Sequence, residues 1–254
     1  MVAPYILGKS EQNIDAPEKI AGRARYAIDA IVPGMLHARV LRSPLPHARI
    51  VSIDTSAARA IPGVMAVITG KDLPVLEDFP GDRPTLAYER VCYIGDAIAA
   101  VAAETLELAE EAMKAIKVEY EELPAVFDPE LAMSEQTPVV IHPSGKGPGG
   151  KVMGNNQCHW YGAEDGDLAK GFAEADLIVE NRFTTGMAQC TPMEPHVAVA
   201  EVDIYDNCVI TCNTQTPYLV KQRVAEILGI APHKVKIIVP PHIGGGFGCK
   251  TRMK

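Results

Sequence analysis

The residues best suited to chemistry lie near the end of the sequence, in the stretch HIGGGFGCKT over residues 242–251. A largely apolar run over 235–239 leads into three consecutive glycines, and Lys250 and Thr251 follow. This order resembles a phosphate-binding P-loop, G-x-x-x-x-G-K-[ST], whose backbone N–H groups surround a phosphate. Cys249 stands where that motif requires glycine. The stretch is therefore either an altered nucleotide site or a glycine loop for another ligand.

The surroundings of the glycines argue against a nucleotide site. Pro240 and Pro241 separate the apolar run from the loop, and only residues 252–254 follow Thr251, where a P-loop continues into a helix. A side chain at Cys249 also hinders the tight turn of a backbone around phosphate. Nucleotide hydrolysis is therefore not expected.

The same glycines favour a different ligand. Consecutive glycines followed by Phe247 and Gly248 leave several bare N–H groups and one aromatic face within a short space. A flexible turn is the simpler interpretation, but this combination suits close approach of the backbone to an anionic or oxo-bearing ligand.

Two further stretches concentrate polar side chains at the ends of predicted strands. AQCTPMEPHVAV contains Gln189, Thr191, Glu194 and His196, and CNTQTPYLVKQRV contains Thr214, Gln215 and Thr216. Each has an ordinary structural interpretation. Either threonine can cap the following helix. His196 can be a packed or edge-strand residue, and Glu194 can pair with an arginine or accept backbone N–H bonds. None of these residues indicates a function alone.

Composition bounds the class of protein. The chain has 254 residues, 47% of them hydrophobic and 22% charged, with a net charge of −8. No apolar run approaches the roughly 18 residues of a membrane span, and the start lacks the pattern of a secretory signal. No basic face is indicated, so nucleic acid is not an expected partner. We expect a cytoplasmic protein.

The cysteines predict neither a metal site nor a disulfide framework. There are six, namely Cys92, Cys158, Cys190, Cys208, Cys212 and Cys249. Cys208 and Cys212 share one predicted strand, where four-residue spacing separates them by about 13 Å. That distance is too long for one disulfide or one metal. Reduced thiols are the expectation, with no iron–sulfur cluster or structural zinc in this chain.

Periodicity predicts strands with one clear helix in the front half. Alternation predicts half-buried strands over 35–43 and 48–56, and a continuous apolar run predicts a buried strand over 93–104. Between them lie a short helix, a Pro-Gly turn and another strand. A helix capped by Thr105 follows, then a strand. The apolar stripe of that helix comprises Leu108, Ala112, Met113 and Ile116.

A loop over 142–156, with seven glycines and prolines, predicts a boundary between two mixed α and β blocks. The second block predicts, in order, a helix capped by Asp167, a strand over 177–185, two strands joined by an Asp206-Asn207 turn, an amphipathic helix ending at Gly229, and a last strand over 233–241.

Taken in order, the motifs TPMEPHVAVAEVD, NTQTPYLVKQRVAEILGIAPHKVKI and GGGFGCK resemble the molybdopterin-binding large subunit of the xanthine dehydrogenase/aldehyde oxidase family of molybdenum hydroxylases. The front half resembles the α/β-hammerhead domain of that family in DAPEKIAGRARYAID, MLHARVLRSPLPHARI, IPGVMAVITGKDLP and YIGDAIAAVAAETLELAEEAMKAIKVEYEELPAV. The resemblance covers nearly the whole chain. It implies an α+β fold with an N-terminal extension over 1–14, a hammerhead domain over 15–127, a linker over 128–157, and an incomplete first molybdopterin-binding domain over 158–254.

The resemblance also implies a cofactor and partners. Such enzymes carry molybdenum on the dithiolene of a pterin, in the cytosine dinucleotide form if the source is bacterial, and insert oxygen from water at an electron-poor carbon. Electrons leave through 2Fe-2S clusters and FAD, here expected on partner subunits. An Fe-S subunit, an FAD subunit and the rest of the molybdopterin-binding chain are therefore the implied partners.

Roles follow residue by residue from the resemblance. Gln215 matches the glutamine that hydrogen-bonds an oxygen ligand of the metal, a role suited to an amide donor. The implied cofactor-binding residues are Gln215, Gly245, Gly246, Phe247 and Gly248, with N–H groups of Gly246 and Gly248 facing cofactor oxygens. The implied substrate pocket contains Phe247 and Thr251. Gln189 and Glu194 match positions with a supporting role, and no residue binds the metal directly.

Two positions depart from the family pattern. Purine-oxidising members carry a glutamate where this chain has Thr251, and a neutral hydroxyl cannot make that charge-assisted contact. Xanthine is therefore a less favoured substrate. The consequence of Cys249, where glycine is common, does not follow from the sequence.

Family large subunits extend far beyond this chain, and their general-base glutamate lies near the far C-terminus. No catalytic residue is therefore expected in this chain, which we expect to be incomplete without the rest of the subunit. Two hypotheses remain open. One is an enzyme subunit acting on an aldehyde, an N-heteroaromatic compound, an aromatic acyl-CoA or carbon monoxide. The other is a truncated, non-catalytic fragment or assembly module that binds no cofactor alone.

Overall fold

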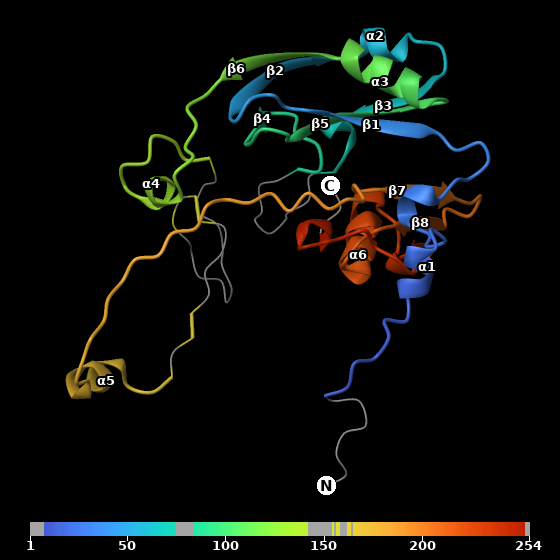
Figure 1. Cartoon of the computed structure of the whole chain (residues 1–254). Helices are drawn as coiled ribbons and strands as arrows, with labels where there is room; N and C mark the ends of the chain where they lie inside the picture. Colours follow the sequence, from blue (N-terminus) through green and yellow to red (C-terminus); the bar gives the residue numbers. More distant parts are fainter. Residues whose placement is uncertain are drawn as a thin grey trace. The chain divides into compact units, whose positions relative to one another are not determined.

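The computed structural model describes residues 8–74, 84–141, 154, 156–157, 162–163 and 165–251. The chain forms two compact units, each described by itself below (Figure 1). The middle unit holds Pro33–Met187. The N/C unit combines Met1–Val32 with Ala188–Met253, so it draws on both ends of the chain.

The middle unit contains two three-stranded antiparallel sheets. The first has the order β1-β5-β3, with β1 at His37–Arg42, β5 at Ala97–Ala103 and β3 at Val64–Thr69. The second has the order β4-β2-β6, with β4 at Arg90–Val91, β2 at Ala48–Asp54 and β6 at Lys117–Glu122. The predicted buried strand is confirmed as β5, whose central position explains its apolar run.

Two helices, α2 at Ser56–Arg59 and α3 at Leu106–Ala115, lie side by side against the first sheet (Figure 1). The predicted cap is confirmed, because the Thr105 side chain accepts a hydrogen bond from the Leu108 N–H. Ala58, Ala99 and Ala112 are fully buried in the shared core. Side chains this small let helix and sheet backbones approach closely.

Shorter elements complete the middle unit. They are the 3₁₀ turn η2 at Gly70–Asp72, α4 at Pro129–Met133 and α5 at Leu168–Glu174. The predicted Asp167 cap is confirmed, since its side chain accepts a hydrogen bond from the Lys170 N–H. None of the described helices is long and apolar enough to cross a membrane.

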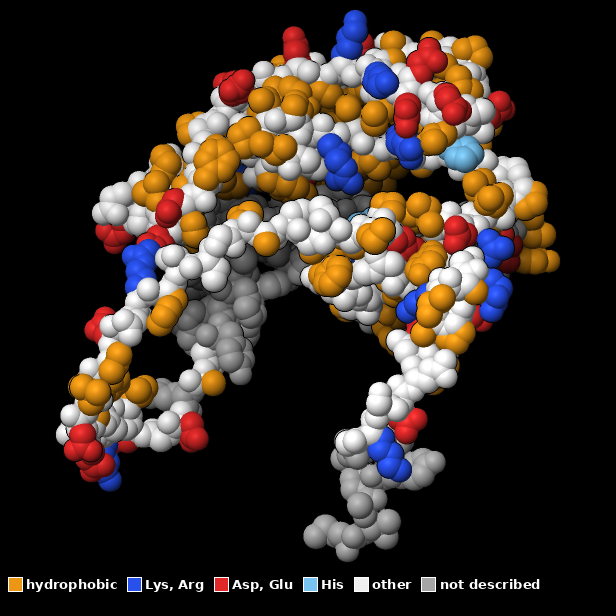
Figure 2. Space-filling model, in the orientation of Figure 1, with side chains coloured by type: hydrophobic (Ala, Val, Ile, Leu, Met, Phe, Trp, Pro, Cys, Tyr) orange, Lys and Arg blue, Asp and Glu red, His pale blue; other side chains and the backbone are white. Residues whose placement is uncertain are grey.

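The strand predicted over 177–185 is wrong. These residues are extended but belong to no sheet, and Leu177, Val179 and Phe183 are 79%, 70% and 86% exposed. A strand needs a neighbour for its backbone hydrogen bonds, and no described segment pairs with this one. Figure 2 shows hydrophobic side chains on the surface of α5 and the extended chain beside it.

The N/C unit is built on a sheet of order β7-β8-β9, with β7 at Ala198–Val202, β8 at Cys208–Cys212 and β9 at Val235–Ile238. β7 and β8 are antiparallel, as their predicted turn requires, and β8 and β9 are parallel. The parallel pair is joined by α6, Pro217–Leu228, and the 3₁₀ turn η4, Pro232–Lys234. Gly229 ends α6 in the left-handed conformation (φ +63°), which confirms the predicted helix end.

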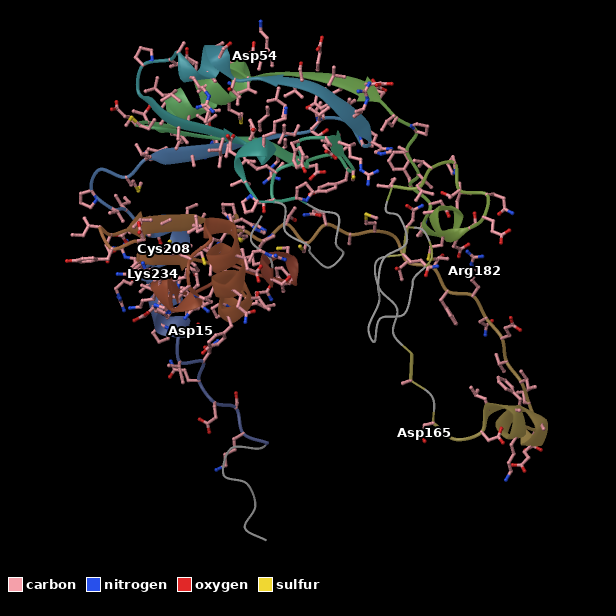
Figure 3. The ribbon with its side chains drawn as sticks, turned by 180° about the vertical axis from the view of Figure 1, so that it is seen from behind. Asp15, Asp54, Asp165, Arg182, Cys208 and Lys234 are labelled. Atoms are coloured by element: carbon pink, nitrogen blue, oxygen red, sulfur yellow. The ribbon has the colours of Figure 1, made fainter. Side chains whose placement is uncertain are left out.

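The core of this unit lies on one face of β8. Cys208, Ile210 and Cys212 are buried there, against Val224 of α6 and Ile237 of β9. Figure 3 labels Cys208 within this sheet. Burial raises the pKa of both thiols. The predicted packing of both cysteines on one strand face is confirmed.

The N-terminal segment supplies α1, Ala16–Ile20, and the 3₁₀ turn η1, Ala27–Asp29, to the N/C unit. The mixed α+β class is confirmed. The domain boundaries proposed from the sequence stay predictions. Most of the predicted glycine-rich loop, and Cys158, lie outside the described residues.

Gly70→Ala should destabilise the middle unit, because a Cβ on Gly70 would lie 2.2 Å from the backbone carbonyl oxygen of Leu86. Backbone cannot yield as a side-chain tip can, so we expect a loss of about 1–3 kcal/mol in thermal or urea unfolding. Gly186→Ala is the matched control, since its Cβ meets open space. Equal stability of the two variants would contradict this packing.

Candidate active site

The site forms where parallel strands β8 and β9 end at the same edge of their sheet. Residues 213–216 follow β8, and the glycine loop over 242–251 follows β9. Loops after the carboxyl ends of parallel strands are common ligand sites. Two hydrogen bonds to the Lys250 carbonyl join the segments, 2.9 Å from the Gln215 N–H and 3.1 Å from Thr214 Oγ1.

The Thr216 hydroxyl also joins these segments, by donating to the Thr251 carbonyl at 2.5 Å. Thr216 is the N-cap residue of α6, as predicted, but its side chain makes no capping hydrogen bond. The capping interpretation is therefore wrong for its hydroxyl. The hydroxyl instead binds the end of the glycine loop and holds that loop to the start of α6.

The Gln215 side chain has a defined polarity. Its Oε1 accepts hydrogen bonds from the N–H groups of Gly248 at 3.1 Å and Lys250 at 3.3 Å. Two N–H donors require the amide oxygen at this position, so the NH₂ end points elsewhere. Among the described residues no hydrogen bond engages Nε2, and Gln215 is exposed. Gln215 therefore presents a fixed amide donor beside the loop.

Gly246 makes this arrangement possible. A Cβ on Gly246 would lie 2.6 Å from Cδ of Gln215 and 2.7 Å from its Oε1. Contacts that short would displace the amide from its two backbone donors. Glycine is therefore required for close approach at this position.

The backbone of the loop carries N–H groups that could serve as donors to a ligand. Gly245, Phe247 and Gly248 have positive φ angles of 95°, 50° and 87°, and left-handed residues of this kind occur in anion-binding nests. No described residue accepts a hydrogen bond from the N–H groups of Gly245, Gly246 or Phe247. The Gly248 N–H is engaged by Gln215. A contact of the Gly248 N–H with a ligand stays a prediction.

The two predicted pocket residues differ in their surroundings. The Phe247 side chain is 75% exposed and its ring lies beside Gly245, where a Cβ would be 3.0 Å from Cε2. The Thr251 hydroxyl turns back and donates to the Gly248 carbonyl at 2.7 Å. Phe247 thus offers an aromatic face, whereas the Thr251 hydroxyl donor is already used within the loop. Their roles in a pocket stay predictions.

Glu194 ties the loop to the rest of the N/C unit. Its Oε2 accepts from the Gly244 N–H at 2.8 Å and from Lys250 Nζ at 3.0 Å, and its Oε1 accepts from the Ala27 N–H at 3.1 Å. The side chains of Glu194 and Lys250 are only 4% and 1% exposed. Acceptance of backbone N–H bonds is confirmed, and the cationic partner is a lysine instead of an arginine.

The fit around Glu194 is close. A Cβ on Gly244 would lie 2.4 Å from Cβ of Glu194, so this glycine lets the loop reach the carboxylate. Burial raises the pKa of Glu194, but the Gly244 N–H, Asn213 and Lys250 more than offset it, and the pKa is lowered overall. Glu194 is therefore an ionised structural group. Because Lys250 is used in this pair, it is not presented to a phosphate.

Sequence reasoning missed two buried residues of this site. Asn213 donates to the Pro195 carbonyl at 2.7 Å and accepts from the Val197 N–H at 3.2 Å, which fixes the segment carrying Glu194. His242 contacts Glu18 at 3.0 Å and its ring packs at a tilt against the ring of Tyr26, which attaches the N-terminal segment to the loop. Asn213 could have been predicted from its place in the sequence, because a polar residue directly after a buried strand often makes structural hydrogen bonds.

Two other residues predicted from the sequence, Gln189 and His196, are exposed. Gln189 is exposed and makes no hydrogen bond with a described residue, so its supporting role stays a prediction. His196 is exposed just before the edge strand β7, in agreement with the surface interpretation.

Family models match both regions of the chain. Residues 21–124 match the aldehyde oxidase and xanthine dehydrogenase a/b hammerhead domain, and residues 151–254 match the molybdopterin cofactor-binding domain. The chain belongs to the molybdenum hydroxylase family. It corresponds to the N-terminal part of the large subunit, with the hammerhead domain and the start of the molybdopterin-binding domain.

Relatives within this family support the assignment. The nicotinate dehydrogenase large molybdopterin subunit of Eubacterium barkeri is 39% identical, over 96% of this chain and 56% of its own. The carbon monoxide dehydrogenase large chain of Afipia carboxidovorans is 34% identical, over 96% of this chain and 32% of its own. This molybdenum hydroxylase chain therefore spans between about a third and just over half of these relatives.

Solved structures of the family agree with the fold. The reconstituted CO dehydrogenase of Oligotropha carboxidovorans matches with a TM-score of 0.80 and 32% identity, over 96% of this chain and 32% of that chain. The aldehyde oxidoreductase of Desulfovibrio gigas matches with a TM-score of 0.76 and 30% identity, over 94% and 27%.

Glu194→Gln should destabilise this molybdenum hydroxylase chain at neutral pH by about 3 kcal/mol, because it leaves the Lys250 charge buried without a counter-ion. The pKa of Glu194 is lower in the folded chain than its ordinary 4.5. The stabilisation is therefore complete above that value and is lost as the pH falls through the lower, folded pKa. Urea unfolding across acid pH should show the wild type and the variant converging.

Glu201→Gln is the control, since Glu201 is an exposed carboxylate on β7 of the same unit. It should unfold like the wild type at every pH. A stability difference between wild type and Glu194→Gln that does not change with pH would contradict the role of the Glu194 charge.

Proposed function

We propose that the chain forms part of the molybdenum-cofactor-binding subunit of an oxidoreductase that hydroxylates its substrate with oxygen from water. The observation that carries this proposal is the polarity of the Gln215 amide. Its oxygen is held by two backbone N–H groups, and its NH₂ end is presented next to the glycine loop. Such a group donates to an oxygen ligand and does not compete for the metal.

The described residues fit the cofactor. Its oxygen atoms require donors, and this edge of the sheet offers Nε2 of Gln215 and the N–H groups of Gly245, Gly246 and Phe247. Gly246 leaves the space that the amide needs. When bound, molybdenum and its pterin supply two-electron oxidation with water as the oxygen source. The chain's own residues bind and orient, and the Glu194–Lys250 pair holds their loop in place.

The partner cofactors belong to the same proposal. A bacterial enzyme would carry the cytosine dinucleotide form of the pterin, and 2Fe-2S and FAD would reside on partner subunits. The general-base glutamate would come from the rest of the large subunit. The relatives are named as large subunits or chains, which supports a multi-subunit complex. A cytoplasmic location stays a prediction.

The residue at position 251 disfavours one class of substrate. Thr251 replaces the glutamate that the family's purine-oxidising members use, and its hydroxyl donates within the loop to Gly248. This disfavours a purine and leaves aldehydes, N-heteroaromatic compounds, aromatic acyl-CoA compounds and carbon monoxide. The exposed ring of Phe247 suits a flat aromatic substrate among these.

Isolation of the native complex tests the proposal. A tagged chain should co-purify with a polypeptide that carries the rest of the large subunit, and with an Fe-S protein and an FAD protein. The complex should contain molybdenum. A stable metal-free monomer in the native host would support the alternative, a non-catalytic assembly module.

Replacement of Gln215 tests the donor. In the assembled enzyme, Gln215→Glu keeps an oxygen for the two backbone N–H groups but removes the amide donor. We expect thermal stability close to wild type and turnover reduced about 10- to 100-fold. Gln215→Ala should lower both quantities, because it also leaves the loop N–H groups without their acceptor.

Gln222→Glu adds the same charge at an exposed position of α6 and serves as the control. Its turnover should equal that of the wild type. Wild-type turnover of Gln215→Glu, at equal molybdenum content, would remove Gln215 from the active site.

A further inference from the structure

The last stretch of the middle unit, residues 168–187, adds nothing to the buried core of that unit. α5 buries none of its residues, and every residue over 175–187 is exposed. Leu168 and Phe172 lie one helical turn apart on α5, and both are more than half exposed (Figure 2). A helix this short depends on tertiary packing for its stability. No described part of the unit buries it, so its packing partner must lie elsewhere.

The extended part of this stretch, residues 177–187, also leaves its backbone unpaired. No described residue exchanges a backbone hydrogen bond with it, and it joins none of the described sheets. Arg182, labelled in Figure 3, forms an ion pair with Glu130 of α4 at 2.6 Å, between two exposed side chains. A row of unpaired N–H and C=O groups is a template to which another strand can add.

The side chains of this extended part separate into two faces, because successive side chains of an extended chain point to opposite sides. One face is mainly apolar and holds Leu177, Val179, Phe183 and Met187. The opposite face holds Glu180, Arg182 and Thr184. Since Arg182 is turned towards Glu130, the apolar face is turned away from that carboxylate. Such a division is typical of a strand that buries one side.

The relatives indicate what can cover this surface. The carbon monoxide dehydrogenase large chain of Afipia carboxidovorans aligns with 96% of this chain but only 32% of its own length. About two thirds of that relative therefore has no counterpart here. A subunit of that length has to pack the additional part against surfaces of the part that this chain represents. Unpaired backbone beside exposed apolar side chains is suited to that packing.

We propose that residues 177–187 add as a strand to a sheet edge in the rest of the large subunit, which covers the apolar face of Leu177, Val179 and Phe183 and packs against α5. The proposal rests on the proposed function for its partner, and it deepens that function by naming where the partner binds. Main-chain hydrogen bonds supply affinity in such strand addition, and alternate side chains set the register. The strand pattern over 177–185, which pairs with no described segment, then has a partner.

Hydrogen–deuterium exchange read by mass spectrometry tests this pairing, with the full chain alone compared with the native complex. In the chain alone, the amides over 177–185 should exchange within seconds, because no described residue protects them. In the complex their exchange should slow by about 100-fold or more. Peptides from β5, which is already paired on both sides, serve as the control and should change little.

Two matched variants test which face is covered. Phe183→Asp places a charge on the apolar face, and Thr184→Asp places the same charge on the opposite face. Both residues are exposed, so the thermal midpoint of the chain alone should equal that of the wild type. In titrations with the purified polypeptide that carries the rest of the large subunit, Phe183→Asp should weaken binding by about 30-fold or more. Thr184→Asp should bind within about twofold of the wild type.

Four results would overturn the proposal. They are unprotected 177–185 amides in the complex, equal binding by the two variants, failure of the large-subunit polypeptide to bind at all, and protection of the chain alone that rises with its concentration, which would make a second copy the occupant. Molybdenum in a complex whose 177–185 amides stay unprotected would leave the proposed function standing and this proposal overturned. Protection in a complex without molybdenum would support this proposal and count against the proposed function.

Discussion

Glu194 is the point at which separate stretches of the N/C unit are held together. Its carboxylate binds Lys250 and the Gly244 N–H from the glycine loop, and the Ala27 N–H from the N-terminal segment. All of this happens away from water, with both charged side chains almost fully buried. A buried charge is costly unless it is paired and hydrogen-bonded, so no one of these contacts can shift without weakening the others.

The exposed part of the site depends on that buried part. With Lys250 fixed, its backbone N–H and carbonyl both bind Gln215, and the loop between Gly244 and Lys250 is pinned at its two ends. The Gln215 amide then has one possible polarity. No described residue accepts a hydrogen bond from the N–H groups over 245–247, so they are available as donors.

Much of the fold followed from local patterns. The alternation in β2, the apolar run of β5, the Thr105 cap and the Gly229 helix end each rest on neighbouring residues, and each was predicted where the structure has it. The strand expected over 177–185 failed because a strand depends on a partner that its own sequence does not specify. The Thr216 hydroxyl failed as a cap because the glycine loop, distant in sequence, accepts its hydrogen bond.

The features of the site also separate into those that the sequence predicted and those that depend on the tertiary structure. The sequence by itself determined the family, through the combined motifs, and singled out Gln215, Glu194 and the glycine loop as unusual. Only the tertiary structure decided that Lys250 is the partner of Glu194 and that Gly246 makes room for Gln215. The physical reason is the crossover between parallel strands. It brings residues more than thirty positions apart to one sheet edge, where hydrogen-bond geometry and desolvation, which no local pattern records, fix what each group does.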